Sequence, residues 1–596
     1  MLLQKPAFLL FYHARAAEAS FGEWLGVLWH GLSLDCTVAG YVTAFPVLVV
    51  LASFWIPLSQ RVWRIVLTVY FSLIALVTAA IFAVDLNLYG YWGFRLDGSV
   101  LIYLSDPGEA LASASWGEVL RQILIMLVYA GAMIWSYRWI LRLFRVEPVP
   151  LRGRVVPTVA ALLIGGLTFL AIRGGVTVAT ANVSKVYFSS NMFLNHAATN
   201  PVFSFLSSVG DNENYAEAYP FFEEERRKTL FEELRGNRPG ADAGTPRLLR
   251  SDRPNVVLIL LESFGRTIMD ETVNGEPVMP NMQRFKREGV WFENFFANSF
   301  RTDRGQVAVL CGFPAQTTMS IMKLPRKSAT LPSLARSLGR EGYRSVFMYG
   351  GDLNFTNQAS FMYSTGWEEL IWQKDMQLDA PTSKWGYADD VVVDLFGDEV
   401  EALGREEQPF LAGLLTLSSH EPFEVPFAKF DDKLLNAMAF SDAQIGRLID
   451  RLRESPVWDN LLVVLVADHG YPYPYDLAYN APLRHRIPMI WLGGALARLP
   501  NSSTYASQID ICATLLAQMG LPHDEFDYSK NIFGATPPHK FGYYCFSDGF
   551  GVIDADGETV YDNTGETVLS QTGPQSERLE WGKAMLQTTY EDIGRR

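Results

Sequence analysis

The sequence predicts an α-helical membrane bundle followed by an α/β domain outside the cytoplasm, whose mostly parallel sheet has helices on both faces. Three observations carry this prediction. Long apolar stretches are confined to the first 180 residues, strand-like and helix-like runs alternate after residue 254, and polar side chains follow several of the strand-like runs. A hydrophobic fraction of 49% beside 19% charged residues fits a chain built of these two parts.

Four segments are close to the ~20 residues that cross a bilayer and are predicted to be transmembrane helices. They cover residues 38–58, 62–84, 119–137 and 156–176. Residues 1–12 are apolar but too short to span, so they either lie at the membrane interface or end a fifth helix. A membrane domain is therefore expected over residues 1–178.

Basic residues predict the orientation of these spans. Arg61 and Arg64 lie in one connection, and another carries Arg138, Arg142, Arg145, Arg152 and Arg154. The loop at 85–118 has one Arg and no Lys. The Arg-rich connections are predicted to be cytoplasmic, which places everything after about residue 180 on the periplasmic or extracellular side of a cell inner membrane. No cleavable signal pattern is visible, so the domain is expected to remain tethered.

Composition excludes some functions. A net charge of −14 argues against a nucleic-acid partner. Three of the four cysteines fall after residue 252, with no CxxC pair, which argues against a disulfide scaffold. Residues 179–251 are expected to form a connector that ends in a Gly/Pro-rich linker at 236–246, and residues 252–596 the catalytic domain.

The catalytic domain is predicted to alternate strands and helices, a pattern typical of βαβ units. Strands are expected at 254–261, 345–349, 410–417, 461–467 and 488–492, and helices at 331–338, 433–453 and 508–519. The run at 461–467 is wholly apolar, as in a strand buried on both faces.

Polar residues follow four of these strands: Glu262, Asp352, His420 and the pair Asp468–His469. Any one of them could be an ordinary loop residue. Parallel strands end at one edge of a sheet, however, and two of only eight histidines fall at such ends. We therefore expect a shared site, in which oxygen and nitrogen donors suit Mn, Zn or a similar divalent ion.

Thr302 is the candidate nucleophile. It lies between Arg301 and the pair Asp303–Arg304, ahead of an apolar run. A hydroxyl needs a metal or a base before it can attack phosphorus. Thr302 could instead cap the following helix, and both roles are compatible because a helix N-terminus also stabilises a phosphate. Arg301 and Arg304 are candidate phosphate clamps, with a solvated role as the alternative.

The segments NVVLILLES, TD, CGFP, GGDLNF, SSHEPF and ADHG together resemble the lipoteichoic acid synthase and phosphoglycerol transferase family of the alkaline phosphatase/sulfatase superfamily. The resemblance implies an alkaline phosphatase-like fold and one divalent ion, manganese before zinc or magnesium. It implies that Glu262, Thr302, Asp468 and His469 bind this ion, and that His420 contacts the head group or moves a proton. A sulfatase proper is disfavoured, because Cys311 is followed by Gly-Phe-Pro-Ala and not by the Cys-x-Pro-x-Arg pattern.

The resemblance also implies a reaction: transfer of a phosphoglycerol group from phosphatidylglycerol to an envelope glycan or glycolipid through a phospho-threonine. The expected substrate contacts are His420, Arg301, Arg304, Asp352 and Asn354. Residues 351–357 lack the Arg that Gram-positive synthases carry after this strand, so phosphoethanolamine transfer stays open.

The sequence also bears on three other functions. A phosphodiesterase or phosphatase would use the same residues with water as acceptor. A pseudoenzyme that acts as a membrane sensor is disfavoured because all four metal-site residues are present. A transporter is disfavoured because no buried acid–base pair is evident in the spans.

Overall fold

The computed structural model describes residues 2–98, 100–101, 116–145, 150–209, 214–236, 242, 244–498, 500–535, 539–573 and 577–596. The chain divides into two compact units, Met1–Glu213 and Asn214–Arg596. The predicted connector at 179–251 is thus shared between the two units. Most of the linker at 236–246 lies outside the described residues, and so do residues 99 and 102–115 of the loop at 85–118.

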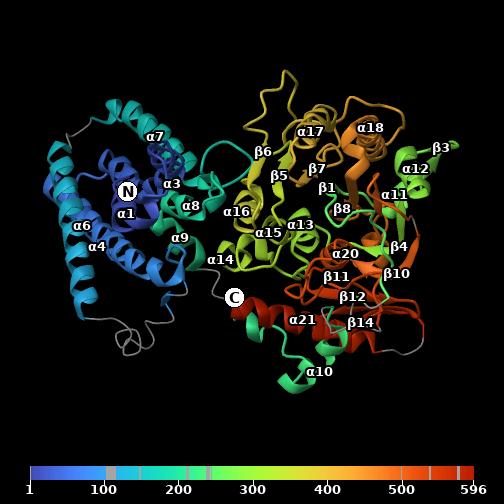
Figure 1. Cartoon of the computed structure of the whole chain (residues 1–596). Helices are drawn as coiled ribbons and strands as arrows, with labels where there is room; N and C mark the ends of the chain where they lie inside the picture. Colours follow the sequence, from blue (N-terminus) through green and yellow to red (C-terminus); the bar gives the residue numbers. More distant parts are fainter. Residues whose placement is uncertain are drawn as a thin grey trace. The chain divides into compact units, whose positions relative to one another are not determined.

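Four helices of the first unit are long and apolar enough to cross a membrane. They are α3 (Phe21–Ser53), α4 (Gln60–Trp92), α6 (Trp116–Leu143) and α7 (Val155–Arg173), drawn in blue to cyan in Figure 1. Helix α4 packs on α6, and α3 packs on α7. Four apolar helices ahead of an α/β domain confirm the predicted architecture.

The first span is longer than predicted and lies earlier in the chain. Helix α3 begins after Ser20, which forms a capping box with Glu23, and it ends at Ser53, short of the expected residue 58. Its first half contains Asp35, which lowers the hydropathy of the segment. The apolar run that predicts this span therefore begins only at residue 38. The segment at 1–12 contains α1 (Gln4–Phe11), a helix of eight residues.

Buried ion pairs occur inside the first unit, at residues that lie outside the four predicted spans. Lys5 Nζ lies 2.6 Å from Asp35 Oδ1, and Arg95 lies 2.9 Å from Asp85 of α4. Asn200 also donates to Asp35 at 2.7 Å. Each acid has a cationic partner at hand, which limits the cost of burying it among apolar helices.

The remaining elements around the connector join one unit or the other. Elements η3 (Val183–Val186), α8 (Met192–Ala198) and α9 (Pro201–Ser208) pack on α3 or α4 in the first unit. Helix α10 (Glu224–Leu234) packs in the second unit on the C-terminal helix α21 (Arg578–Arg595), where Arg227 pairs with Glu591 at 3.0 Å.

An eight-stranded sheet forms the centre of the second unit, in the order β10-β4-β9-β8-β1-β7-β5-β6. Its strands are β1 (Asn255–Leu261), β4 (Val290–Phe296), β5 (Arg344–Tyr349), β6 (Glu369–Trp372), β7 (Phe410–Leu415), β8 (Leu461–Ala467), β9 (Met489–Leu492) and β10 (Ser502–Ser507). Only β9 runs antiparallel to its neighbours, so the sheet is mostly parallel as predicted.

Helices cover both faces of this sheet. Helices α17 (Asp389–Leu403) and α18 (Lys433–Glu454) pack together on one face, while α13 (Thr302–Cys311), α15 (Leu334–Arg340) and α20 (Ile511–Gln518) lie on the other (Figure 1). With helices on both sides, β8 is buried along its whole length. This burial explains the uninterrupted apolar run at 461–467.

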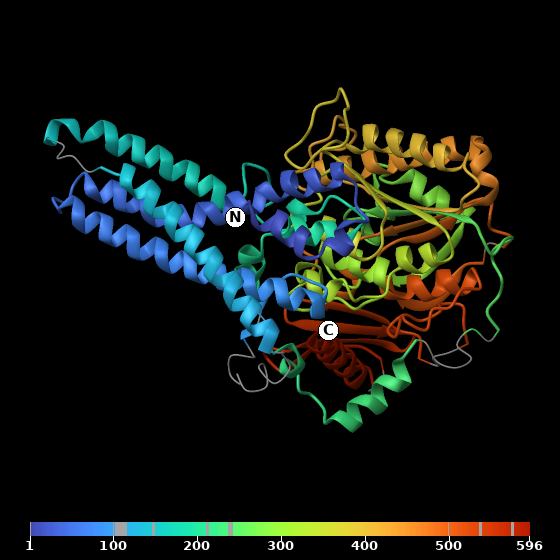
Figure 2. The same cartoon turned by 60° about the vertical axis from the view of Figure 1, so that its left-hand side comes forward.

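A second, antiparallel sheet completes the unit and was not predicted. Strands β11 (Gly542–Phe546), β12 (Gly549–Asp554), β13 (Gly557–Asp562) and β14 (Thr567–Gln571) pair in sequence order. Helix α21 packs on β12 and β13, and this module is red in Figure 2. Its strands contain glycine and charged residues, which obscures their apolar alternation.

Candidate metal and nucleophile site

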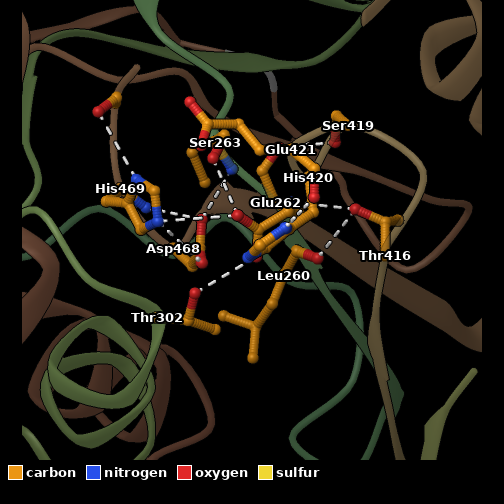
Figure 3. A network of polar contacts seen from close by, with 12 residues as sticks. Leu260, Glu262, Ser263, Thr302, Thr416, Ser419, His420, Glu421, Asp468 and His469 are labelled. Carbon is orange, nitrogen blue, oxygen red and sulfur yellow. Dashed lines mark hydrogen bonds and ion pairs between the residues drawn. The ribbon is translucent and has the colours of Figure 1, made fainter. Parts of the chain in front are cut away.

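Three of the predicted metal ligands come together at the carboxyl edge of the sheet. One ligand atom from each of Glu262, Asp468 and His469 lies within 4.8 Å of the other two. Strands β1 and β8 are adjacent and parallel, with Leu261 paired to Ala467, so the next residues of both strands emerge side by side. Figure 3 shows the three side chains pointing toward one another.

Asp468 has the geometry of a metal ligand. Its Oδ1 accepts from the backbone N–H groups of Ser263 at 2.8 Å and His469 at 2.7 Å. Its Oδ2 is buried and receives no hydrogen bond. A buried carboxylate oxygen without a donor is costly, and a divalent cation would remove that cost.

The electrostatics of the cluster agree with this interpretation. Burial, followed by the charge of Asp468, raises the pKa of Glu262 to about 7. Burial likewise raises the pKa of Asp468 to about 6 and lowers the pKa of His469. Each shift disfavours the charged form that an isolated group would adopt, as expected where acids are crowded without a counter-ion. Two carboxylates, an imidazole and a hydroxyl therefore form a donor set that fits one divalent metal ion.

Thr302 completes the cluster as its hydroxyl group. It is the first residue of α13, and its Oγ1 donates to Glu262 Oε2 at 3.2 Å. The N-cap of the helix is Arg301, so the Thr302 side chain does not cap the helix and is directed at the carboxylate instead. Helix α13 approaches β8 closely, because a Cβ on Gly305 would lie 2.0 Å from the Asp468 carbonyl oxygen.

Three hydroxyl groups missed by the prediction hold the turn at Glu262. Ser263 has a φ of 63°, and its Oγ donates to Glu262 Oε1 at 2.7 Å. The Glu262 N–H donates to Thr416 Oγ1 at 2.8 Å, and Ser419 Oγ donates to the Glu262 carbonyl at 2.7 Å. The Glu-Ser and Ser-Ser-His segments contained these residues, but nothing in their spacing showed that strand β7 would brace strand β1.

His420 lies at the same edge, on the loop after β7 (Figure 3). Its Nδ1 is 2.8 Å from the Glu421 carbonyl, and its ring packs on Trp385 at 4.4 Å between centroids. Trp385 also contacts Phe355 at 5.6 Å. Trp385 was missed because it comes from a loop far from every strand end in the sequence. The His420 imidazole therefore lies beside Trp385, which in turn packs against Phe355.

The other predicted substrate contacts differ in their exposure and in their hydrogen-bond partners. Asp352 follows β5, and its Oδ1 accepts from both the N–H and the side-chain amide of Asn354, at 2.9 and 2.8 Å. These two residues precede Phe355 and so share the edge with His420. Arg301 is exposed. Arg304 is buried and donates to the Thr317 carbonyl at 3.2 Å, so its guanidinium is engaged in holding another loop.

Comparison with known proteins finds a family model and several relatives that match part of the chain. The sulfatase family model matches residues 254–521. The chain is 33% identical over 290 residues to phosphoglycerol transferase I of Xanthomonas campestris pv. campestris, covering 44% of this chain and 40% of that protein. It is 25% identical over 328 residues to lipoteichoic acid synthase 1 of Bacillus subtilis, covering 47% and 48%. The chain therefore spans less than half the length of these relatives.

Two solved structures share the fold. A protein in the alkaline phosphatase superfamily from Vibrio parahaemolyticus superposes with a TM-score of 0.55 and 23% identity, over 64% of this chain and 98% of that one. The lipoteichoic acid synthase LtaP from Listeria monocytogenes superposes with a TM-score of 0.52 and 18% identity, over 62% and 98%.

Proposed function

We propose that this chain, whose residues 254–521 form a sulfatase-family domain with the alkaline phosphatase-superfamily fold, is a membrane-anchored phosphoglycerol transferase. The observation that carries the proposal is the Thr302 hydroxyl, held 3.2 Å from Glu262 within the candidate metal cluster and at the N-terminus of α13. The relatives named phosphoglycerol transferase and lipoteichoic acid synthase support the choice of reaction.

The donor is proposed to be a phospholipid, phosphatidylglycerol, and the acceptor an envelope glycan or glycolipid. Four apolar helices keep the chain at a membrane, which raises the effective concentration of a lipid donor. The Arg-rich connections support a location of the catalytic unit on the periplasmic or extracellular side of the inner membrane.

One divalent ion, with manganese preferred, would bind Glu262, Thr302, Asp468 and His469 and supply Lewis acidity to the hydroxyl and the phosphoryl oxygens. In the first step, Thr302 Oγ1 bonds to phosphorus, its proton is directed at Glu262 Oε2, the bond to the diacylglycerol oxygen breaks, and that oxygen takes up a proton from solvent as diacylglycerol leaves. The N-terminus of α13 stabilises the negative phosphoryl group. The product is a glycerophospho-threonine.

In the second step, the oxygen of an acceptor hydroxyl bonds to phosphorus, the bond to Thr302 Oγ1 breaks, and Thr302 Oγ1 recovers a proton from Glu262. His420 is proposed to take the proton of that hydroxyl. Asp352, Asn354 and Arg301 are proposed to contact the glycerol or its phosphate. If water replaced the acceptor, the same residues would perform phosphodiester hydrolysis.

A phosphoethanolamine donor is the second candidate, and one observation favours it. The Trp385 ring lies against His420, and an indole face attracts an ammonium group, which glycerol lacks. No Arg follows Asp352 before residue 360 to favour a second anion there.

The test is to purify the full chain in detergent and incubate it with Mn²⁺ and either phosphatidylglycerol or phosphatidylethanolamine. Mass spectrometry of the Thr302 peptide should show a glycerophosphate adduct with the first lipid. An ethanolamine phosphate adduct would select the second candidate. Thr302→Ala should lose the adduct and nearly all transfer, and full activity of that variant would refute the mechanism.

A further inference from the structure

Arg484 contacts two aromatic rings, one of which belongs to the segment just before Thr302. It belongs to the short helix α19 (Pro482–His485), on the segment that follows Asp468 and His469. Its guanidinium lies 4.6 Å from the centre of the Tyr479 ring and 5.9 Å from that of Phe300, two residues before Thr302. The backbone is also close to the metal cluster, because a Cβ on Gly470 would lie 2.1 Å from the Arg484 carbonyl oxygen.

Within the described part of the chain, Arg484 has no acceptor for its charge. Its Nε is buried without a hydrogen bond, and no carboxylate among the described residues pairs with it. Other arginines of the described part of this unit behave differently. Buried Arg266 and Arg578 pair with Asp270 and Asp554. The arginines that, like Arg484, lack an acceptor are exposed: residues 287, 301, 405, 498 and 595.

The guanidinium of Arg484 is partly buried and cationic. Partial burial lowers its pKa, but it remains a cation at neutral pH. A buried N–H without an acceptor is costly, and an anion bound beside Phe300 and Tyr479 would supply an acceptor for Nε.

We propose that Arg484 binds a nonbridging oxygen of the phosphoryl group that Thr302 receives, an inference that rests on the proposed function and names its phosphate-binding residue. A guanidinium that contacts two aromatic rings is restricted in its motion, and its N–H donors form a fork that suits phosphate oxygens. Arg304, one of the arginines predicted for this role, instead donates to the Thr317 carbonyl. Arg301 also lies near the Phe300 ring, at 5.8 Å, but it is exposed, whereas Arg484 is partly buried and contacts a second ring.

The experiment measures anion binding without turnover. The full chain in detergent with Mn²⁺ is titrated calorimetrically with inorganic phosphate and with glycerol phosphate, and with glycerol as a control ligand. Arg484→Gln should weaken the affinity for both anions by roughly 10- to 100-fold, as expected for the loss of charge-assisted hydrogen bonds. Arg484→Lys should fall between, since it keeps the charge and loses the fork. Arg405→Gln, which removes an exposed and unpaired arginine beyond the end of α17, should change nothing.

Unchanged anion affinity in Arg484→Gln would overturn the proposal. The rate of adduct formation on Thr302 shows whether Arg484 binds the phosphate of the transferred group or a phosphate of the acceptor. A slower first step shows that Arg484 binds the transferred group, whereas an effect confined to the second step would assign it to the acceptor and overturn the proposal. If Arg484→Gln unfolds at a lower temperature than the parent protein, the anion affinity of Arg484→Lys tests the proposal instead. If phosphate affinity depends on Arg484 but no phospholipid yields an adduct, the phosphate site stands and the proposed function fails.

Discussion

Glu262 and Asp468 make the stability of the metal-free protein depend on pH. Burial raises their pKa values from the ordinary 4.5 and 3.8 to about 7 and about 6. The folded state therefore binds these protons more tightly than the unfolded chain does. The contribution of the two groups to the free energy of unfolding is full below about pH 4 and is lost as the pH rises to about 7. A bound divalent cation reverses the penalty, because it stabilises the ionised carboxylates.

Metal should therefore stabilise the protein more at pH 8 than at pH 5.5. Thermal unfolding of the detergent-solubilised chain, with Mn²⁺ or with a chelator at each pH, measures the difference. Glu262→Gln removes one titrating acid and should flatten the curve of the metal-free protein. A metal-induced shift in melting temperature that is equal at the two pH values would contradict this account of the site.

His420 should matter for the second half of the reaction more than for the first. Replacement by Gln removes the proposed base for the acceptor hydroxyl, and loss of general base catalysis typically costs roughly 10²- to 10⁴-fold. The phospho-threonine should then accumulate, since Thr302 and the metal cluster are intact. Quenched-flow sampling followed by intact-mass analysis gives both rates.

His539 offers the matched control for that variant. Its ring packs on Trp581 of α21, with 4.5 Å between the ring centroids, and it is not part of the candidate site. His539→Gln should leave both steps unchanged. A His420→Gln variant that forms adduct slowly but transfers it at the normal rate would assign the residue to donor binding instead.

At the scale of the element, the contact of α13 with β8 fixes the distance between nucleophile and ligands. Gly305→Ala would bring a methyl group to 2.0 Å from the Asp468 carbonyl, so the helix must move away from the strand end. Overpacking of this kind costs about 1–3 kcal/mol of stability. The displaced Thr302 should also lower transfer activity well beyond the loss of folded protein.

Gly339→Ala is the control within a helix of the same layer. No atom lies within 4 Å of the added Cβ at this position of α15, so the change should be neutral or should stabilise by about 0.5–1 kcal/mol. Denaturant unfolding and a transfer assay on both variants measure the two effects. Equal behaviour of the two variants would show that the close contact at Gly305 does not position Thr302.

The strand ends were predictable from the sequence because their signal is local. An apolar run followed by Asp468 and His469, or by Glu262, gives both the strand and the polar end. The strands β4, β6 and β10 were missed. Their runs include Glu293, Glu369 and several Ser or Thr residues, which interrupt an apolar pattern although the chain buries much of β4. Contacts made across the sheet, such as Thr416 with Glu262, leave no local signal.

On the scale of the whole molecule, hydropathy located the spans but not the polar residues within them. Asp35 and Asp85 lie in helices that can cross a membrane because Lys5 and Arg95 neutralise their charges. The two partners of each pair are more than one helical turn apart in the sequence, so local hydropathy does not show that they pair. The division between units at Glu213 was equally hidden. Residues 179–209 pack on the membrane helices through contacts that composition does not record.

The orientation of the chain in its membrane is the last prediction, and it rests on the arginines that flank the spans. If the catalytic unit lies outside, a cysteine at exposed Arg405 should react with a membrane-impermeant maleimide in cells whose outer barrier, where present, is permeabilised. A cysteine at Arg142, near the end of α6, should react only after the inner membrane is opened. The background should be low, because Cys311, Cys512 and Cys545 are buried, and Cys36 can be replaced by Ser. The reverse labelling pattern would place the metal cluster in the cytoplasm, where the proposed envelope acceptor is absent, and would refute the proposed function together with the topology.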